Sequence, residues 1–402
     1  MSTTRPRLAV RLLVLFALGL AFSISLGSAK AVTGFTPLSD MGAATYLGFG
    51  GGLYESGTNS VPADHAAAGA AHAAAVRPLD ASGNPSAGGK IVLLSIGMSN
   101  TTQEWCSASS ALPCDAYTLM GQAAASASVN HTSLVIVNGA AGGQTASTWD
   151  SPADANYDRV RDTRLTPAGV SEQQVQAVWL KVADAGPTVS LPSASSDAYA
   201  LETFMGNDVR ALKTRYPHLQ LVFASSRIYA GYASTALNPE PYAYESGFSV
   251  KWLIQAQVDQ TRNSGVVVDA RAGDLNLATG APWIAWGPYL WADGATPRSD
   301  GLTWQTGDFA ADGTHPATSG RTKVGNMLMS FFLGSPYSQC WFGVGCAAAS
   351  VGGVAERPDL AALPSMRSAT GRGDAIYAVG VAVAIVVALT AGAAGWRRRR
   401  AR

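Results

Sequence analysis

The sequence is poor in charged residues, which make up 14% of its 402 residues and leave a formal net charge of +1. Proteins that bind nucleic acid usually present a broad basic face. The one dense arginine cluster of this chain lies at its extreme C-terminus, at 397–400. We therefore expect no nucleic-acid partner.

Cysteine is also scarce, with four residues that fall into two close pairs: Cys106 with Cys114, and Cys340 with Cys346. Neither pair has the Cys-x-x-Cys spacing that is typical of zinc sites, so no metal site is predicted. Four cysteines allow three pairings, and distance along the chain favours the two local disulfides. Such bridges are typical of an oxidising compartment.

The N-terminus has the features of an export signal. Arg5, Arg7 and Arg11 precede an apolar stretch at 12–26, and Ala29-Lys30-Ala31 offers a cleavage site between small residues. This pattern predicts a signal peptide over 1–31. An uncleaved N-terminal membrane anchor is the alternative, because the apolar stretch is long for a signal core.

A second apolar stretch, at 375–396, carries no charge and is long enough to cross a bilayer as a helix. The basic tail at 397–402 is expected to stay in the cytoplasm. The sequence therefore predicts an exported protein held at the cell membrane by one C-terminal transmembrane helix, with its bulk outside. The segment 363–367 resembles a sortase signal but lacks the Thr-Gly pair, so a simple anchor is preferred.

Between these ends, short apolar runs alternate with longer amphipathic segments. The runs predict strands at 90–96, 133–138, 175–180, 219–224 and 266–269, and the segments between and after them predict helices at 116–128, 196–215, 249–263 and 317–333. This alternation predicts an α/β fold with about five parallel strands. The residues at 274–311 interrupt it with tryptophans among glycines and prolines, which suggests a loop or lid.

These patterns divide the chain into six parts. They are a signal peptide at 1–31, a wrapping N-terminal extension at 32–89 with a helix at 65–76, a main domain at 90–346, a spacer at 347–374, the transmembrane helix at 375–396 and the basic tail at 397–402.

Two short motifs carry the chemistry. The first predicted strand runs into Gly97-Met98-Ser99-Asn100, which places a serine hydroxyl at a sheet edge where a following helix points free N–H groups. Much later, Asp312-Gly313-Thr314-His315 offers a histidine to take the serine proton and an aspartate to orient its ring. A rate that rises as the histidine loses its proton would be expected. Ser99 as a helix N-cap, and His315 as a cap of the last helix, are the structural alternatives.

These motifs resemble two blocks of the SGNH (GDSL-like) hydrolases. The glycine turn at 138–144, followed by Trp149, is similar to a region of the carbohydrate and sialate O-acetylesterase branch. The resemblance covers roughly 89–334. It implies a three-layer α/β/α, flavodoxin-like fold and the hydrolysis of small esters, often acetyl groups on sugars. An α/β-hydrolase is disfavoured, because its Gly-x-Ser-x-Gly elbow would need glycine where this chain has Thr101.

The resemblance assigns roles to individual residues. Ser99 is the nucleophile, His315 the general base and Asp312 its orienting carboxylate. The backbone N–H groups of Ser99 and of Gly142 or Gly143 would form the oxyanion hole.

The family's third block normally adds an asparagine or glutamine side chain to this hole, whereas this chain has Lys181 there. Lys181 would stabilise the oxyanion, bind an anionic substrate, or serve only the structure. The triplet at 206–208 imitates the missing block but falls inside a predicted helix.

Substrate contacts are expected from side chains beyond the strand ends and from the aromatic loop: Asn100, Arg227, Tyr229, Trp286 and Trp291. The tryptophans would either stack on sugar rings or pack a lid. The sequence thus predicts a membrane-tethered extracellular serine esterase that needs no cofactor and acts on an acylated small molecule or polysaccharide. The alternative is an SGNH scaffold with little or no turnover that binds carbohydrate at the cell surface.

Overall fold

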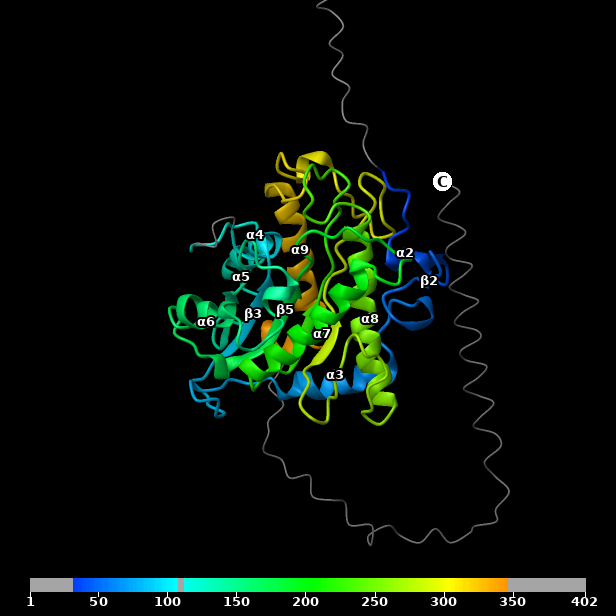
Figure 1. Cartoon of the computed structure of the whole chain (residues 1–402). Helices are drawn as coiled ribbons and strands as arrows, with labels where there is room; N and C mark the ends of the chain where they lie inside the picture. Colours follow the sequence, from blue (N-terminus) through cyan, green and yellow to red (C-terminus); the bar gives the residue numbers. More distant parts are fainter. Residues whose placement is uncertain (1–31, 108–111, 346–402) are drawn as a thin grey trace, which may run out of the picture. The chain divides into compact units, whose positions relative to one another are not determined.

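A computed structural model of the chain describes residues 32–107 and 112–345. Its centre is a parallel sheet in the order β4–β3–β5–β6–β7. Figure 1 shows β3 and β5 side by side. The strands are β3 (Ile91–Gly97), β4 (Leu134–Asn138), β5 (Val175–Lys181), β6 (Leu221–Ala224) and β7 (Trp283–Trp286). This order confirms the predicted five-stranded parallel sheet. It places the change of winding direction between β3 and β5, where ligand sites of such sheets form.

Helices pack in two groups on the sheet. In one, α7 (Asp197–Arg215) packs against α8 (Tyr242–Arg262); in the other, α4 (Ser99–Trp105), α5 (Leu119–Ala125) and α10 (Gln339–Phe342) pack against α9 (Thr318–Gly334). Figure 1 shows α7 and α8 in front of the sheet, with α9 behind it. β3 and β5 are buried along their whole length, as expected for strands covered on both faces.

Four of the predicted strands match β3 to β6, but the prediction of a strand at 266–269 is wrong. Val266, Val267 and Val268 are exposed and lie in an irregular segment that follows α8 and its turn. The fifth strand is β7, inside the aromatic segment that was predicted to be a loop or lid. A short apolar run does not reveal its secondary structure by itself, because exposed irregular segments also tolerate valine. α8 begins at Tyr242, before the predicted start at residue 249.

The predicted C-terminal transmembrane helix is contradicted. Across 32–107 and 112–345, no helix is long and apolar enough to cross a membrane. The prediction rested on apolar composition alone, whereas the long helices described here carry charged residues and pack on a sheet. The segment 375–396 lies outside the described residues, as does 1–31 with the predicted signal peptide. Neither the anchor nor the extracellular membrane localisation built on it is retained.

The residues before β3 cover the free edge of β7. Helix α3 (Ala63–Ala75) brings His65, whose Nε2 donates to the Ile284 carbonyl over 2.8 Å. The Gln257 side chain accepts from the Ile284 N–H over 2.8 Å, so both outward-facing groups of this residue are paired. An uncovered sheet edge invites pairing with other chains, and these side chains remove that opportunity.

The residues before α3 form α2 (Leu38–Met41) and a two-stranded hairpin of β1 (Thr45–Tyr46) and β2 (Phe49–Gly50). Thr33 and Gly34 donate backbone N–H groups to the Asp293 carboxylate over 2.9 Å each. Lys251 on α8 donates to the Gly50 carbonyl over 2.7 Å. Residues of α2 also belong to the main hydrophobic core. This segment is therefore built into the same core as the sheet.

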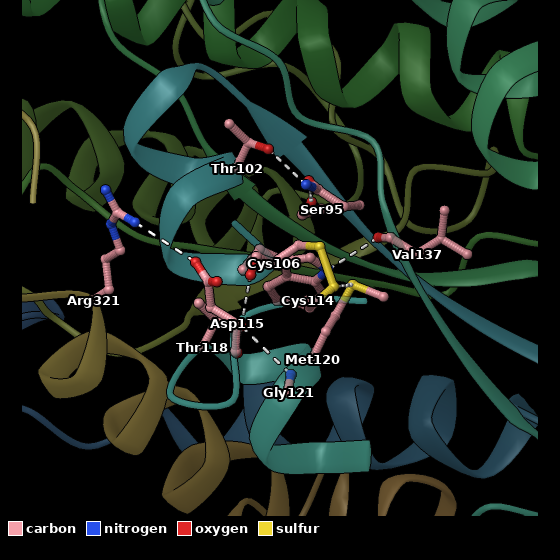
Figure 2. The surroundings of a disulfide bond; sticks show 12 residues. Ser95, Thr102, Cys106, Cys114, Asp115, Thr118, Met120, Gly121, Val137 and Arg321 are labelled. Atoms are coloured by element: carbon pink, nitrogen blue, oxygen red, sulfur yellow. Dashed lines mark hydrogen bonds and ion pairs between the residues drawn. A yellow bond between two sulfur atoms is a disulfide. The ribbon is translucent and has the colours of Figure 1, made fainter. Parts of the chain in front are cut away.

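A disulfide joins Cys106, directly after α4, to Cys114, with an S–S distance of 2.11 Å. Figure 2 shows this bridge beside Asp115, whose carboxylate faces Arg321 of α9. The first predicted pairing is thus confirmed. Cys340 is also disulfide-bonded, and its predicted partner Cys346 lies outside the described residues. Between β4 and β5, the chain also forms the short helix α6 (Ala155–Val160).

The edge contact gives the first prediction. His65→Ala removes a buried donor and leaves the Ile284 carbonyl unpaired, which should lower the free energy of unfolding by about 1–3 kcal/mol. Urea unfolding of the full chain measures it. His131→Ala is the matched control, because its exposed ring bonds only the Ser126 carbonyl, and it should change stability by less than about 0.5 kcal/mol. Equal losses in both variants would show that α3 does not protect the edge.

Candidate active site

Ser99 is the first residue of α4, two residues after β3 ends at Gly97. A Cβ atom on Gly97 would lie 2.0 Å from the Lys181 carbonyl oxygen, so no larger residue fits where β3 passes the end of β5. Thr101 on α4 donates its hydroxyl to the same carbonyl over 2.6 Å. These contacts hold the first turn of α4, and with it the serine, against the end of β5.

Ser99, His315 and Asp312 form a hydrogen-bonded chain. His315 Nε2 lies 2.8 Å from Ser99 Oγ, and His315 Nδ1 lies 2.5 Å from Asp312 Oδ2. The other carboxylate oxygen, Oδ1, accepts the N–H groups of Thr314 and His315 over 2.9 and 3.0 Å. Burial acts to raise the pKa of Asp312, but the hydrogen bonds from His315 and Thr314 outweigh it and lower that pKa. The ionised carboxylate keeps the proton on Nδ1 and leaves Nε2 free to accept.

Asn100 connects α4 to the loop that carries Asp312 and His315. This buried side chain, which was predicted to bind substrate, donates to the Thr314 carbonyl over 3.0 Å and so links α4 to the loop. Gly313 adopts a positive φ of +65°, and a Cβ there would lie 1.9 Å from the Tyr232 carbonyl oxygen. The Asp-Gly-Thr-His spacing thus depends on a glycine in a tight turn.

The glycine turn after β4 lies next to the serine. A Cβ on Gly142 would come within 3.9 Å of Ser99 Cβ, and Gly143 has a positive φ of +77°. Asn138 anchors the start of the turn: its amide accepts from Ser95 over 2.9 Å and donates to Thr102 over 2.6 Å. The Ala141 N–H donates to the Gly97 carbonyl over 3.1 Å. The two predicted sources of oxyanion N–H groups, Ser99 and Gly142, are therefore neighbours.

Lys181 does not belong to this hole. Its side chain is fully buried, and its ammonium group donates to both carboxylate oxygens of Glu104, at 2.5 Å to Oε1. Burial lowers the pKa of Lys181 to about 8 and raises the pKa of Glu104. The prediction of an oxyanion or substrate role is corrected, because an ammonium group whose hydrogen bonds go to a buried carboxylate is a structural partner.

The predicted aromatic contacts are also corrected. Trp286 is 4% exposed and Trp291 is fully buried; their indole N–H groups donate to the Leu53 carbonyl over 2.7 Å and to the Glu240 carboxylate over 2.8 Å. Tyr229 is fully buried as well. These side chains pack the core, because each ring covers a large apolar area while its polar atom finds a partner. They offer no surface on which a sugar ring could stack.

The remaining predicted residue, Arg227, follows β6. It is 2% exposed, and one of its guanidinium nitrogens lies 3.8 Å from the sulfur of Met98, the residue before Ser99. Glu104 was not among the predicted site residues, although its carboxylate binds Lys181. Nothing in the sequence indicates a pairing with Lys181 across 77 residues. Asn207 and Asp208 lie within α7, as predicted.

Metal chemistry has no candidate centre in the described residues, where no group of three His, Cys, Asp or Glu side chains could hold an ion. The titratable groups that reach the serine are His315 and, through its ring, Asp312. A side-chain exposure of 22% for His315 and 31% for Asp312 leaves it accessible to a substrate.

No protein-family model matches the chain, and no curated protein is similar to it. Solved structures that match include one described as a GDSL-like lipase from Parabacteroides merdae, at 12% identity over 60% of this chain and 94% of that one, with a TM-score of 0.29. A carbohydrate esterase family 2 enzyme with a carbohydrate-binding domain, from Corynascus thermopiles (Myceliophthora fergusii), matches at 14% identity over 60% and 65%, with a TM-score of 0.29.

An extracellular lipase from Streptomyces rimosus matches at 13% identity over 60% of this chain and 99% of that one, with a TM-score of 0.28. The chain is thus similar to structures described as a GDSL-like lipase, a carbohydrate esterase and an extracellular lipase. Overlaps this loose carry no argument about activity or residue roles. The functional argument therefore rests on the geometry of Ser99, His315 and Asp312.

The Lys181–Glu104 pair gives the second prediction. Lys181→Met leaves a buried carboxylate without its cation and should lower the free energy of unfolding by about 3–5 kcal/mol. The double variant Lys181→Met with Glu104→Gln should recover part of that loss, because no charge is then stranded. Thermal and urea unfolding of the two variants measure the difference. A Lys181→Met protein of normal stability that had lost only its turnover would return Lys181 to the oxyanion hole.

Proposed function

We propose that this protein is an SGNH-type serine esterase that hydrolyses small acyl esters. One observation carries the proposal: Ser99 Oγ, His315 Nε2, His315 Nδ1 and Asp312 Oδ2 are linked by hydrogen bonds of 2.8 and 2.5 Å at an accessible edge of the sheet. If Ser99 only capped a helix, its hydroxyl would not need a hydrogen bond to His315. If His315 only capped a helix, its ring would not need a hydrogen bond to Asp312. The complete chain of three groups is the arrangement that activates a serine nucleophile.

In the proposed reaction, Ser99 Oγ attacks the ester carbonyl carbon while its proton moves to His315 Nε2. Asp312 stabilises the imidazolium that forms, through the hydrogen bond to Nδ1. The tetrahedral intermediate collapses as the alcohol leaves with the proton from Nε2, and an acyl-enzyme remains on Ser99. Water then attacks the acyl carbon with His315 as base, releasing the acid and restoring the serine hydroxyl.

The oxyanion is proposed to bind the N–H groups of Ser99 and Gly142. Ser99 starts α4, where the helix leaves N–H groups unpaired and its dipole favours negative charge. Gly142 lies beside it on the glycine turn. Lys181 is bound to Glu104, so this hole has two donors rather than three. Because one donor is typically worth about 10²–10³ in kcat, a modest turnover is expected.

The substrate is proposed to be an acylated small molecule or polysaccharide, with O-acetyl groups on carbohydrate as the first class to test. The resemblance of the motifs to the O-acetylesterase branch supports this choice. The tryptophans do not support it, because Trp286 and Trp291 are buried. The missing third donor favours one rival, a carbohydrate-binding scaffold with little or no turnover.

The third prediction tests catalysis directly. The full chain should hydrolyse p-nitrophenyl acetate with a burst of nitrophenol equal to the enzyme concentration if deacylation is slow. Ser99→Ala and His315→Ala should each lower kcat/KM by at least about 10³-fold. Ser319→Ala and His131→Ala alter an exposed serine and an exposed histidine away from the hydrogen-bonded chain, and they should leave the rate unchanged. A folded wild-type protein that turns over neither this ester nor acetylated sugars would contradict the esterase and favour the binding scaffold instead.

Asp312→Asn supplies the fourth prediction. The amide keeps the shape of the carboxylate but donates toward Nδ1, which places the proton on Nε2 and stops that atom from accepting the serine proton. By analogy with the same substitution in serine proteases, kcat should fall about 10⁴-fold near neutral pH. Steady-state kinetics with circular dichroism as a folding check measure this. A loss below tenfold would mean that Asp312 only braces the loop.

A further inference from the structure

The guanidinium of Arg227 is buried against Met98, the residue before Ser99, and two of its three nitrogens lack an acceptor among the described residues. In the part of the chain that the structure describes, neither Nε nor Nη2 has a hydrogen-bond partner, although the residue is only 2% exposed. Nη1 contacts the Met98 sulfur at 3.8 Å, and a thioether is a weak acceptor. Burial without acceptors is costly for a charged donor. A group of this kind points to an acceptor that arrives with a ligand.

The carboxylates nearest to Arg227 in electrostatic reach are Glu104, Glu240 and Asp312. Each is engaged elsewhere. Glu104 binds Lys181 with both oxygens, and Asp312 accepts from the backbone and ring of His315.

Glu240 accepts from the indole of Trp291 over 2.8 Å and from two backbone N–H groups over 2.9 Å each. No carboxylate in this neighbourhood is therefore left to pair with Arg227.

The charge balance gives the same result. The Lys181–Glu104 pair sums to zero wherever its shared proton lies, because the two groups are either both charged or both neutral. Arg227 stays protonated in proteins. The Lys181–Glu104 pair therefore does not neutralise Arg227, and Glu240 and Asp312 form their hydrogen bonds with other groups. A guanidinium fork binds the two oxygens of a carboxylate or phosphate with good geometry.

The position of this charge connects it to the reaction. Arg227 follows β6 at the same sheet edge that presents the serine, and the Ser246 hydroxyl holds its backbone N–H over 3.2 Å. Its side chain touches Met98, which directly precedes Ser99. Methionine is unbranched and flexible, so its side chain can move aside when a ligand enters.

We propose that Arg227 binds an anionic oxygen group of the substrate, so that the ester attacked by Ser99 carries a carboxylate or comparable negative group near its carbonyl. This inference rests on the proposed esterase function and narrows its substrate class. The negative group belongs either to the acyl part or to the alcohol part of the ester. In both cases the negative group would form a bidentate salt bridge with the guanidinium of Arg227.

Two matched pairs of esters test the proposal. The mono-4-nitrophenyl ester of adipic acid against 4-nitrophenyl hexanoate places the charge on the acyl part, and 4-acetoxybenzoate against 4-acetoxybenzamide places it on the alcohol part. In at least one of the two pairs, kcat/KM of the full chain should be about 10- to 100-fold higher for the anionic ester than for the neutral one. Arg227→Met should remove that preference, while Arg227→Lys should keep part of it because the charge remains.

Arg210→Met is the matched control, since its half-buried guanidinium already donates to the Ala272 carbonyl over 2.6 Å; the anionic-to-neutral ratio should not change. A wild-type enzyme that hydrolyses the neutral esters but shows no preference in either pair would overturn the inference and leave the esterase intact. A preference that survives Arg227→Met would also overturn it.

A binding measurement that needs no turnover tests the anion site at Arg227 separately from the proposed esterase activity. In the Ser99→Ala protein at constant ionic strength, adipate or 4-acetoxybenzoate should raise the melting temperature, whereas adipamide and 4-acetoxybenzamide should not. This result is expected even if Arg227→Met fails to fold or the wild type turns over no ester. Equal shifts from the anionic and neutral compounds, or none from either, would contradict an anion site at Arg227.

Discussion

The close approach of β3 to the end of β5 is the contact on which the site depends. Gly97 lets the chain pass against the Lys181 carbonyl, and Thr101 donates to that same oxygen from the first turn of α4. Together they fix where α4 begins, and α4 begins with Ser99. The Ala141 N–H binds the Gly97 carbonyl and brings the glycine turn to the same point. The proposed nucleophile and the proposed oxyanion donors are thus positioned by backbone packing at one strand end.

Beneath this point lies an unusual concentration of buried charge. Lys181, Glu104 and Arg227 are all excluded from solvent, and a buried ion pair seldom adds stability over apolar residues. The pair between Lys181 and Glu104 nevertheless joins the end of β5 to α4, the helix that carries the nucleophile. We infer that this ion pair orients α4 on the sheet, while Nε and Nη2 of Arg227 have no hydrogen-bond partner among the described residues. On this inference, the Lys181–Glu104 pair positions α4, and Arg227 is available to bind substrate.

Local patterns predicted much of the fold and of the candidate site. Continuous apolar runs marked β3 to β6, since parallel strands are buried on both faces. The Asp-x-x-His spacing identified Asp312 and His315, whose contact needs only one tight turn. Prediction failed where burial decides the role of a residue. The valines at 266–268 are exposed, although their apolar run predicted a strand. Trp286 is buried, although it was predicted to contact substrate.

The sequence by itself determined four of the five strands of the central sheet, the serine at a strand end and the aspartate–histidine block, because each depends on neighbours a few residues apart. Only the tertiary structure decided that Lys181 binds Glu104, that the tryptophans lie in the core, and that Arg227 lies beside Met98 without an acceptor. These outcomes depend on which distant segments share one edge of the sheet. Charge pairing and burial are properties of that arrangement, and no local pattern contains them.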